Sequence, residues 1–91
     1  MTQQSWTIKR ESKFIKQFKL IGHARQIKVL KAIEDLVTSR DPSDFGVYKA
    51  SIRAFAYELG KGDRMIFDID YPNHAILLLR VCDHKSAYGM D

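Results

Sequence analysis

The spacing of apolar residues changes once along this chain, at a turn-rich segment over residues 40–46, and this change constrains the fold more than any other feature. Before it, residues 23–39 carry an apolar side chain at every third or fourth position, as one face of a helix does. After it, residues 64–71 alternate apolar and polar side chains, as a strand with one buried face does. The sequence therefore predicts helices in the first half of the chain and strands in the second.

Two helices are expected before the turn-rich segment. The first begins at Ser12, whose side-chain oxygen we expect to cap it, and Gly22 is expected to end or bend it. The second helix covers residues 23–39. The apolar stripes of the two helices are Phe14, Ile15, Phe18 and Ile21, and then Ile27, Leu30, Ile33, Leu36 and Val37.

Four strands are expected, at residues 5–9, 52–59, 64–71 and 75–81. The first alternates about Trp6 and Ile8 and has a polar flank, which predicts a sheet edge. The second and third are joined by a glycine hairpin at residues 60–63, because glycine reaches positive φ without steric cost. The last is almost all apolar, which predicts burial on both faces. In the third strand, one face carries Met65, Phe67, Ile69 and Tyr71, and the other carries Arg64, Asp68 and Asp70.

These elements predict an α+β fold, in the order strand, helix, helix, strand, strand, strand. A small, curved, mainly antiparallel sheet is expected, with the N-terminal helical hairpin packed on one face. Since 91 residues provide for one core, we expect a single domain over residues 1–91. The opposite face of the sheet is expected to be concave and partly open, and a site could lie there.

Composition excludes several classes of protein and site. A hydrophobic content of 45% is too high for a disordered chain, and the longest apolar run, residues 75–79, is too short to cross a bilayer. The single cysteine, Cys82, excludes an intrachain disulfide and a multi-cysteine zinc site. The three histidines lie in separate segments, so we expect no metal, and the sequence has no GxGxxG or P-loop motif, so we expect no cofactor. Residues 1–10 lack a signal-peptide pattern, and we therefore expect a cytoplasmic protein.

Basic residues are few in the second half of the chain, so each is a candidate for binding an anion. Residues 41–91 hold six Lys and Arg against eight Asp and Glu, although the net charge of the whole chain is +4. The planar guanidinium of Arg64 can donate two hydrogen bonds to a phosphate, and a salt bridge to Asp68 or Asp70 is the alternative. The other candidates are Arg53 on the strand at residues 52–59, Lys49 at the entry to that strand, and Arg80 on the last strand.

The tail after the last strand is chemically dense, because His84, Lys85 and Tyr88 lie within five positions. An imidazole with an ordinary pKa of about 6.5 can accept or donate a proton near neutral pH, and a tyrosine can do so if cations lower its pKa. These groups could meet at one site at the strand end. The alternative is that the ring of Tyr88 packs on the sheet edge while His84 and Lys85 are solvated.

The order of elements and two short motifs resemble the RelE/ParE toxin superfamily, nearest its RelE-like branch. The resemblance extends over essentially the whole chain, which would then be a single RelE-like toxin domain. The residues that carry it are Trp6, the loop from Asp41-Pro42 to Gly46, the motif Gly62-Asp63-Arg64-Met65-Ile66-Phe67 and the motif Asp83-His84-Lys85…Tyr88.

The resemblance implies the toxin of a type II toxin–antitoxin system. RelE-like members are endoribonucleases that cut messenger RNA on the ribosome and so inhibit translation. The 2′-OH attacks the adjacent phosphorus, the 5′-oxygen leaves, and no metal is needed. The implied partners are an acidic, RelB-like antitoxin, the ribosome and mRNA, with no membrane. The implied catalytic residues are Arg64, His84, Lys85 and Tyr88, and the implied RNA-binding residues are Lys49, Arg53 and Arg80.

Two alternatives remain open at this point. The ParE branch shares the fold, lacks the nuclease residues and inhibits DNA gyrase. A chain with this fold could also be a non-catalytic module that binds an antitoxin helix or strand through its apolar helical stripe or its open sheet edges.

Overall fold

The computed structural model describes residues 5–83, which form a helical layer and one sheet. The elements along the chain are β1 (Thr7–Arg10), α1 (Ser12–Leu20), α2 (His23–Val37), the 3-10 helix η1 (Pro42–Phe45), β2 (Val47–Lys49), β3 (Ala54–Gly60), β4 (Asp63–Asp70) and β5 (Ala75–Asp83).

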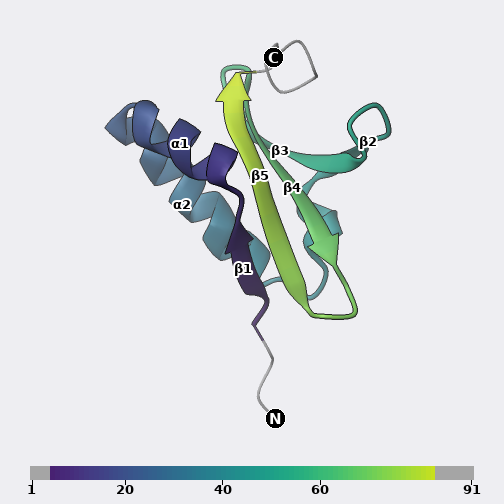
Figure 1. The fold of residues 1–91 in the computed structure, drawn as a ribbon. Helices are drawn as coiled ribbons and strands as arrows, with labels where there is room; N and C mark the ends of the chain where they lie inside the picture. Colours follow the sequence, from purple (N-terminus) through teal and green to yellow (C-terminus); the bar gives the residue numbers. More distant parts are fainter. Residues whose placement is uncertain (1–4, 84–91) are drawn as a thin grey trace.

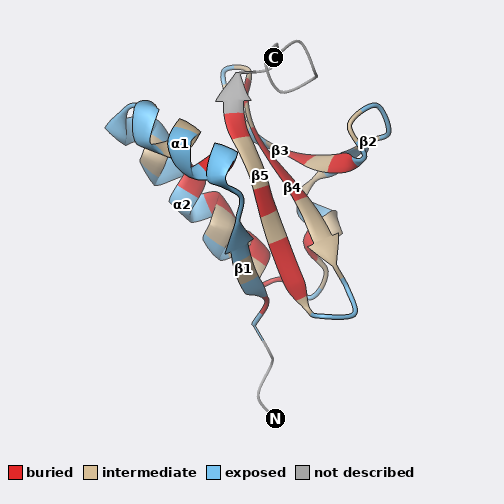
Figure 2. Cartoon of the chain, viewed as in Figure 1, coloured by how far each residue is buried: buried red, intermediate tan, exposed pale blue. Residues whose placement is uncertain are grey.

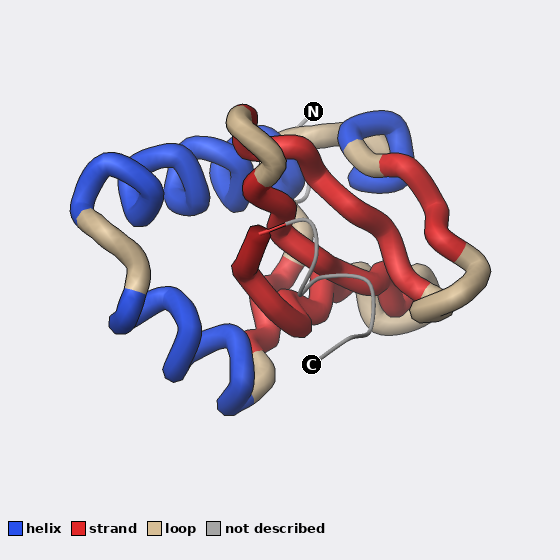
Figure 3. Tube along the Cα trace, turned by 90° about the horizontal axis from the view of Figure 1, so that it is seen from above, coloured by secondary structure: helices blue, strands red, loops and turns tan. Residues whose placement is uncertain are grey.

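The five strands lie in the order β1-β5-β4-β3-β2. β1 runs parallel to β5, and the other three pairs of neighbours are antiparallel. Both α-helices cover the same face of this sheet, as Figure 1 and the view from above in Figure 3 show. The predicted α+β fold is therefore confirmed, and so is the edge position of the first strand.

β2 is a strand that the sequence did not predict. Val47 and Lys49 pair with Ala56 and Ala54 of β3, and the connecting turn is closed by the N–H of Ile52, which donates to the carbonyl of Lys49 at 3.2 Å. Three residues are too few to display a period of two. The pairing with β3, and not a pattern of its own, holds this segment in the sheet.

The start of α1 is fixed by Glu11, and the prediction that Ser12 caps the helix was wrong. Glu11 is the N-cap and makes no side-chain cap hydrogen bond. Its N–H donates to the carbonyl of Leu78 in β5 at 2.9 Å, and its carbonyl accepts from the N–H of Ile15 at 3.1 Å. A backbone contact with the sheet therefore decides where the helix begins. The helix ends before Gly22, as predicted.

α2 turns a different stripe toward the sheet from the predicted one. Its buried residues are Val29, Ala32 and Leu36, whereas Ile27 and Leu30 are 53% and 55% exposed. The helix carries apolar residues on two adjacent stripes, so the period alone does not say which stripe is buried. The predicted burial of Leu36 is confirmed, whereas the predicted burial of Ile27 and Leu30 was wrong.

The main core lies between the helices and the sheet. Figure 2 shows buried segments along β4 and β5 and exposed residues over much of α1 and β1. The buried residues of this core are Trp6, Phe14, Val29, Ala32, Leu36, Met65, Phe67, Ile76, Leu78 and Val81. A second cluster, Ala54, Ala56 and Ile66, lies on the other face of the sheet. Leu77 and Leu79 are half-buried, so β5 is less enclosed than its composition predicts.

Trp6 fastens β1 to the end of α2. Its side chain is 6% exposed, its indole Nε1–H donates to the carbonyl of Ser39 at 3.0 Å, and its backbone N–H donates to the carbonyl of Val37 at 3.2 Å. The imidazole of His74 stacks on the indole with ring centroids 3.8 Å apart. A four-residue edge strand is marginal by itself, and these contacts hold it in place.

Asp41 organises the predicted loop, which forms η1. Its Oδ1 accepts hydrogen bonds from the N–H of Ser43 at 3.1 Å and from the hydroxyl of Tyr71 at 2.8 Å. The bond from Tyr71, followed by those from Ser43, holds the pKa of Asp41 below its ordinary value. β4 ends at Asp70 and Tyr71 is 52% exposed, so Tyr71 does not belong to the strand on which the sequence predicts it.

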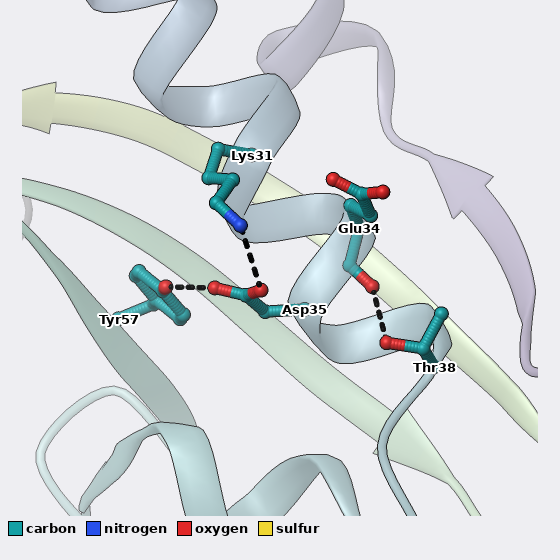
Figure 4. Close-up of polar contacts among 5 residues, drawn as sticks. All are labelled: Lys31, Glu34, Asp35, Thr38 and Tyr57. Atoms are coloured by element: carbon teal, nitrogen blue, oxygen red, sulfur yellow. Dashed lines mark hydrogen bonds and ion pairs between the residues drawn. The ribbon is translucent and has the colours of Figure 1, made fainter.

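A polar contact joins α2 to β3, as Figure 4 shows. The hydroxyl of Tyr57 donates to Oδ2 of Asp35 at 2.8 Å, and Nζ of Lys31 lies 3.7 Å from Oδ1 of the same carboxylate. Burial and the hydrogen bond to Asp35 raise the pKa of Tyr57 to about 12. At the C-terminus of the helix, the hydroxyl of Thr38 donates to the carbonyl of Glu34 at 2.9 Å.

Replacing Tyr57 with Phe should lower the free energy of unfolding by about 1 kcal/mol at neutral pH, because one hydrogen bond is lost. The folded-state pKa is raised from the ordinary 10.0, so the wild type keeps this contribution below pH 10.0 and loses it as the pH rises toward about 12. Urea unfolding of both proteins over this range measures the effect. A difference between them that is independent of pH would contradict the contact.

Candidate functional site

The face of the sheet opposite the helices brings together side chains from four strands, and we call it the open face. Directly paired residues of neighbouring strands point to the same side of a sheet. The register of the pairs therefore assigns the open face the residues Val47, Lys49, Ala54, Ala56, Glu58, Arg64, Ile66 and Arg80.

A hollow of about 130 Å³ lies on the open face. It contains an aromatic ring, two cations, one carboxylate and two small apolar side chains. The residues that line it are Phe45, Val47, Lys49, Ala56, Glu58 and Arg64. The structure thus brings together Lys49 and Arg64, two of the predicted site residues that lie 15 positions apart in the sequence.

Arg64 is held in a defined position within this hollow. Its Nη2 lies 3.0 Å from Oε2 of Glu58, and its Nη1 donates to the carbonyl of Asp63 at 3.4 Å. The side chain of Arg64 is 15% exposed, whereas that of Glu58 is 67% exposed. A guanidinium carries five N–H donors, so it can donate to an incoming anion while keeping Glu58, or exchange the exposed carboxylate of Glu58 for that anion.

The hairpin before Arg64 is anchored to the helical layer. Gly60 and Gly62 have φ values of +101° and +84°, which confirms the predicted glycine turn. The carboxylate of Asp63 is almost buried, and its Oδ2 lies 3.0 Å from Nε of Arg25 in α2. This ion pair fixes the start of β4, and with it the strand position from which Arg64 extends.

The alternative partners considered for Arg64 are engaged elsewhere. Oδ1 of Asp68 accepts a hydrogen bond from the N–H of Ile69 at 2.8 Å, and Oδ2 of Asp70 accepts from Nδ2 of Asn73 at 2.8 Å. The ion partner of Arg64 is Glu58, its direct neighbour in the register of β3 and β4.

A β-bulge places Arg80 on the open face. Ile66 pairs with Arg80 and Phe67 pairs with Leu78, so Leu79 is an extra residue in β5. Strict alternation from Leu78 would have turned Arg80 toward the helices, because side chains alternate between faces. The bulge shifts this alternation, and Val81 enters the core instead.

Arg53 is placed differently from Lys49 and Arg64. It lies in the turn between β2 and β3 with a φ of +53°, and its side chain is exposed. Arg53 is not one of the described residues that line the hollow. Its role in binding RNA stays a prediction.

The tail residues His84, Lys85 and Tyr88 lie outside the described residues. β5 reaches Asp83, and its residue Cys82 pairs with Arg64 in the register of β4 and β5. The described part of the chain therefore ends beside the backbone of Arg64. The part that the tail takes in the site remains a prediction.

Two lining residues were missed in the sequence, Phe45 and Glu58. A signal for Glu58 was present, because it and Arg64 flank the glycine hairpin at nearly equal distances, and such residues pair across a hairpin. For Phe45 the signal was weaker: a large aromatic residue directly follows the turn residues Ser43 and Asp44.

A second hollow, of about 140 Å³, lies between the helices on the other side of the molecule. Its lining is mainly apolar, with a cation from β1 and one from α1. We call it the helical groove, and it is lined by Arg10, Phe14, Ile15, Phe18, Lys19, Leu30 and Ile33. Leu30 and Ile15 are 55% and 38% exposed, so this groove exposes apolar surface.

Within residues 5–83 there is no cluster of three or more His, Cys, Asp or Glu side chains that could hold a metal ion. A helix with the length and apolar character needed to span a membrane is also absent from this part of the chain.

Replacing Glu58 with Gln should strengthen phosphate binding by about fivefold, because the carboxylate no longer competes for Arg64. Titration with inorganic phosphate, followed through the NMR signal of the Arg64 Nε–H, measures this affinity. Glu34→Gln is the matched control, since it removes the same charge from an exposed position on α2. Equal phosphate affinity in the two variants would contradict the role of Glu58.

The fold is shared with known toxins, although the sequence is not. No protein-family model matches the sequence, and no curated protein matches it. A mutant of the E. coli toxin RelE in the free state has a TM-score of 0.75 at 9% identity, covering 92% of this chain and 88% of that chain.

Two toxin–antitoxin complexes contain a similar chain. The archaeal RelE–RelB complex from Pyrococcus horikoshii matches with a TM-score of 0.68 at 15% identity, over 97% of this chain and 100% of that chain. The intact E. coli RelBE complex matches with a TM-score of 0.73 at 10% identity, over 87% of this chain and 96% of that chain. The resemblance found in the sequence is therefore confirmed at the level of the fold: the chain has the fold of the RelE toxins.

Proposed function

We propose that this chain is the toxin of a toxin–antitoxin pair and that it cuts messenger RNA bound to the ribosome. The observation that carries the proposal is the hollow on the open face, where Arg64 and Lys49 line one surface of a RelE-like fold. An RNA backbone presents one negative charge at each phosphate, and Lys and Arg side chains on a shared face bind it through these charges.

The proposed reaction breaks the bond between phosphorus and the 5′-oxygen. The 2′-oxygen attacks the phosphorus in line while a base removes its proton, and the 5′-oxygen leaves with a proton from an acid. The products are a 2′,3′-cyclic phosphate and a 5′-hydroxyl. This chemistry needs two groups that transfer protons, and it also needs cations that stabilise the phosphorane. We propose that it proceeds without a metal.

We assign the cationic role to Arg64 and Lys85 and the proton transfers to His84 and Tyr88. Arg64 is always charged, so it can stabilise the phosphorane but cannot act as a base. An imidazole changes its charge near neutral pH and suits either proton transfer. Binding on the ribosome would hold the mRNA in the in-line geometry. The proposed RNA-binding residues are Lys49, Arg53 and Arg80.

We further propose an acidic, RelB-like antitoxin as the partner. The helical groove supports this, because it combines exposed apolar side chains such as Leu30 with the cations Arg10 and Lys19 on its lining. An amphipathic segment with an acidic polar face satisfies both features. The P. horikoshii and E. coli structures described above are complexes of RelE with RelB.

Induction of the wild-type chain in cells should stop growth and produce new 5′ ends within translated mRNA. Arg64→Ala should reduce this cleavage by at least about 100-fold, because a cation that stabilises the transition state is worth several kcal/mol. Primer extension on a translated reporter mRNA measures the cleavage. The same mRNA without a ribosome-binding site should remain intact.

Lys16→Gln is the control for this test, since Lys16 lies exposed on α1, in the layer that covers the opposite face of the sheet. It should cleave like the wild type. Growth arrest without any cleavage, accompanied by loss of gyrase supercoiling activity, would overturn the nuclease proposal in favour of the gyrase-inhibiting alternative. Normal growth on induction without an antitoxin would favour a non-catalytic binding module.

A further inference from the structure

Phe45 is a large apolar side chain that stays 45% exposed, although the core of the protein lies nearby. It lines the hollow on the open face together with Lys49 and Arg64. A single exposed apolar residue is ordinary on a protein surface. An exposed aromatic ring in the same hollow as two cations is a more specific combination, because nucleic acids present both flat bases and charged phosphates.

The backbone on both sides of Phe45 is anchored. Before it, Pro42 is buried, and Oδ1 of Asp41 accepts from the N–H and the hydroxyl of Ser43 at 3.1 and 2.9 Å. After it, Gly46 lies so close to the sheet that a Cβ there would be 2.9 Å from the ring of Phe67. The ring is therefore presented from a fixed support, which lowers the entropic cost of binding a ligand on it.

We propose that Phe45 is a stacking platform for a nucleobase of single-stranded RNA, next to a phosphate held by Arg64 and Lys49. The inference rests on the proposed function, since RNA is the ligand in both, and it adds a residue and an interaction to that site. An apolar protein segment in this hollow would bury the charges of Arg64 and Lys49 without adding an anion to the site. A nucleotide satisfies the ring and the cations together.

Tyr48 shows that exposure and aromatic character alone do not define the platform. It is 54% exposed, but its ring packs edge-on against Phe55, with centroids 5.2 Å apart. Tyr48 also pairs with Phe55 in the register of β2 and β3, and Phe55 stacks on the core residue Phe67. Tyr48 therefore belongs to the face that carries the helices and serves as a matched control.

Stacking and phosphate binding differ in their response to salt. A cation that binds a phosphate displaces counterions, so each such contact on a single strand contributes about 0.7 to the slope of log affinity against log salt. Stacking displaces no counterions. Removing the ring of Phe45 should therefore weaken binding at every salt concentration and leave this slope unchanged.

The test measures the fluorescence anisotropy of a labelled, short 2′-O-methyl RNA mixed with the chain at several salt concentrations. Phe45→Ala should raise the Kd by about 5-fold to 100-fold with an unchanged slope. Phe45→Trp should restore binding, and Tyr48→Ala should bind like the wild type. Arg64→Gln should reduce the slope by about 0.7. Thermal unfolding of each variant checks that the fold is intact.

Unchanged affinity in Phe45→Ala overturns the inference, and so does an equal loss in Tyr48→Ala or the lack of any binding by the wild type. The 2′-O-methyl group prevents cleavage, so binding is measured independently of the nuclease reaction. If the chain cuts no mRNA but Phe45→Ala still weakens binding, the proposed reaction fails and the platform stands. If the wild type cuts mRNA and Phe45→Ala binds normally, the platform fails and the reaction stands.

Discussion

The register of β3, β4 and β5 is the constraint on which the rest of the structure depends. Successive side chains of a strand point to opposite faces, so a slip of one residue would exchange the two faces of β4. In the observed register Met65 and Phe67 enter the core, and Arg64 lies on the open face beside Glu58. The apolar face of β4 stabilises this register, because Met65 and Phe67 are buried against the helices only in this pairing. The register in turn sets the position of the Arg64 guanidinium.

Much of the fold could be predicted, because local patterns record burial on one face. The helices and the strand at residues 64–71 follow from periodicity, the last strand from its apolar run, and the glycine hairpin from the requirement for positive φ. Three features could not be predicted because they arise from tertiary contacts. The start of α1 is set by a bond to Leu78, the buried stripe of α2 by its fit to the sheet, and the face of Arg80 by the bulge at Leu79.

The candidate site was predictable in part for the same reason. Arg64 on a predicted strand and Lys49 at the entry to another were identified as candidate cations, and the sheet brings them to one hollow. Glu58 and Phe45 were missed, although the glycine hairpin indicates the pairing of Glu58 with Arg64; the place of Phe45 in the hollow follows only from the folded chain. The open face and the helical groove lie on opposite sides of the sheet, so the proposed RNA-binding and antitoxin-binding surfaces can be altered by separate substitutions.

An NMR titration of the isotope-labelled chain with a short 2′-O-methyl RNA tests most directly whether RNA binds on the open face. The largest shifts should fall on Lys49, Glu58 and Arg64, and the signals of α1 and α2 should remain nearly constant. Shifts concentrated on the lysines of the two helices, with the open face unchanged, would contradict the assignment of the open face as the RNA-binding surface.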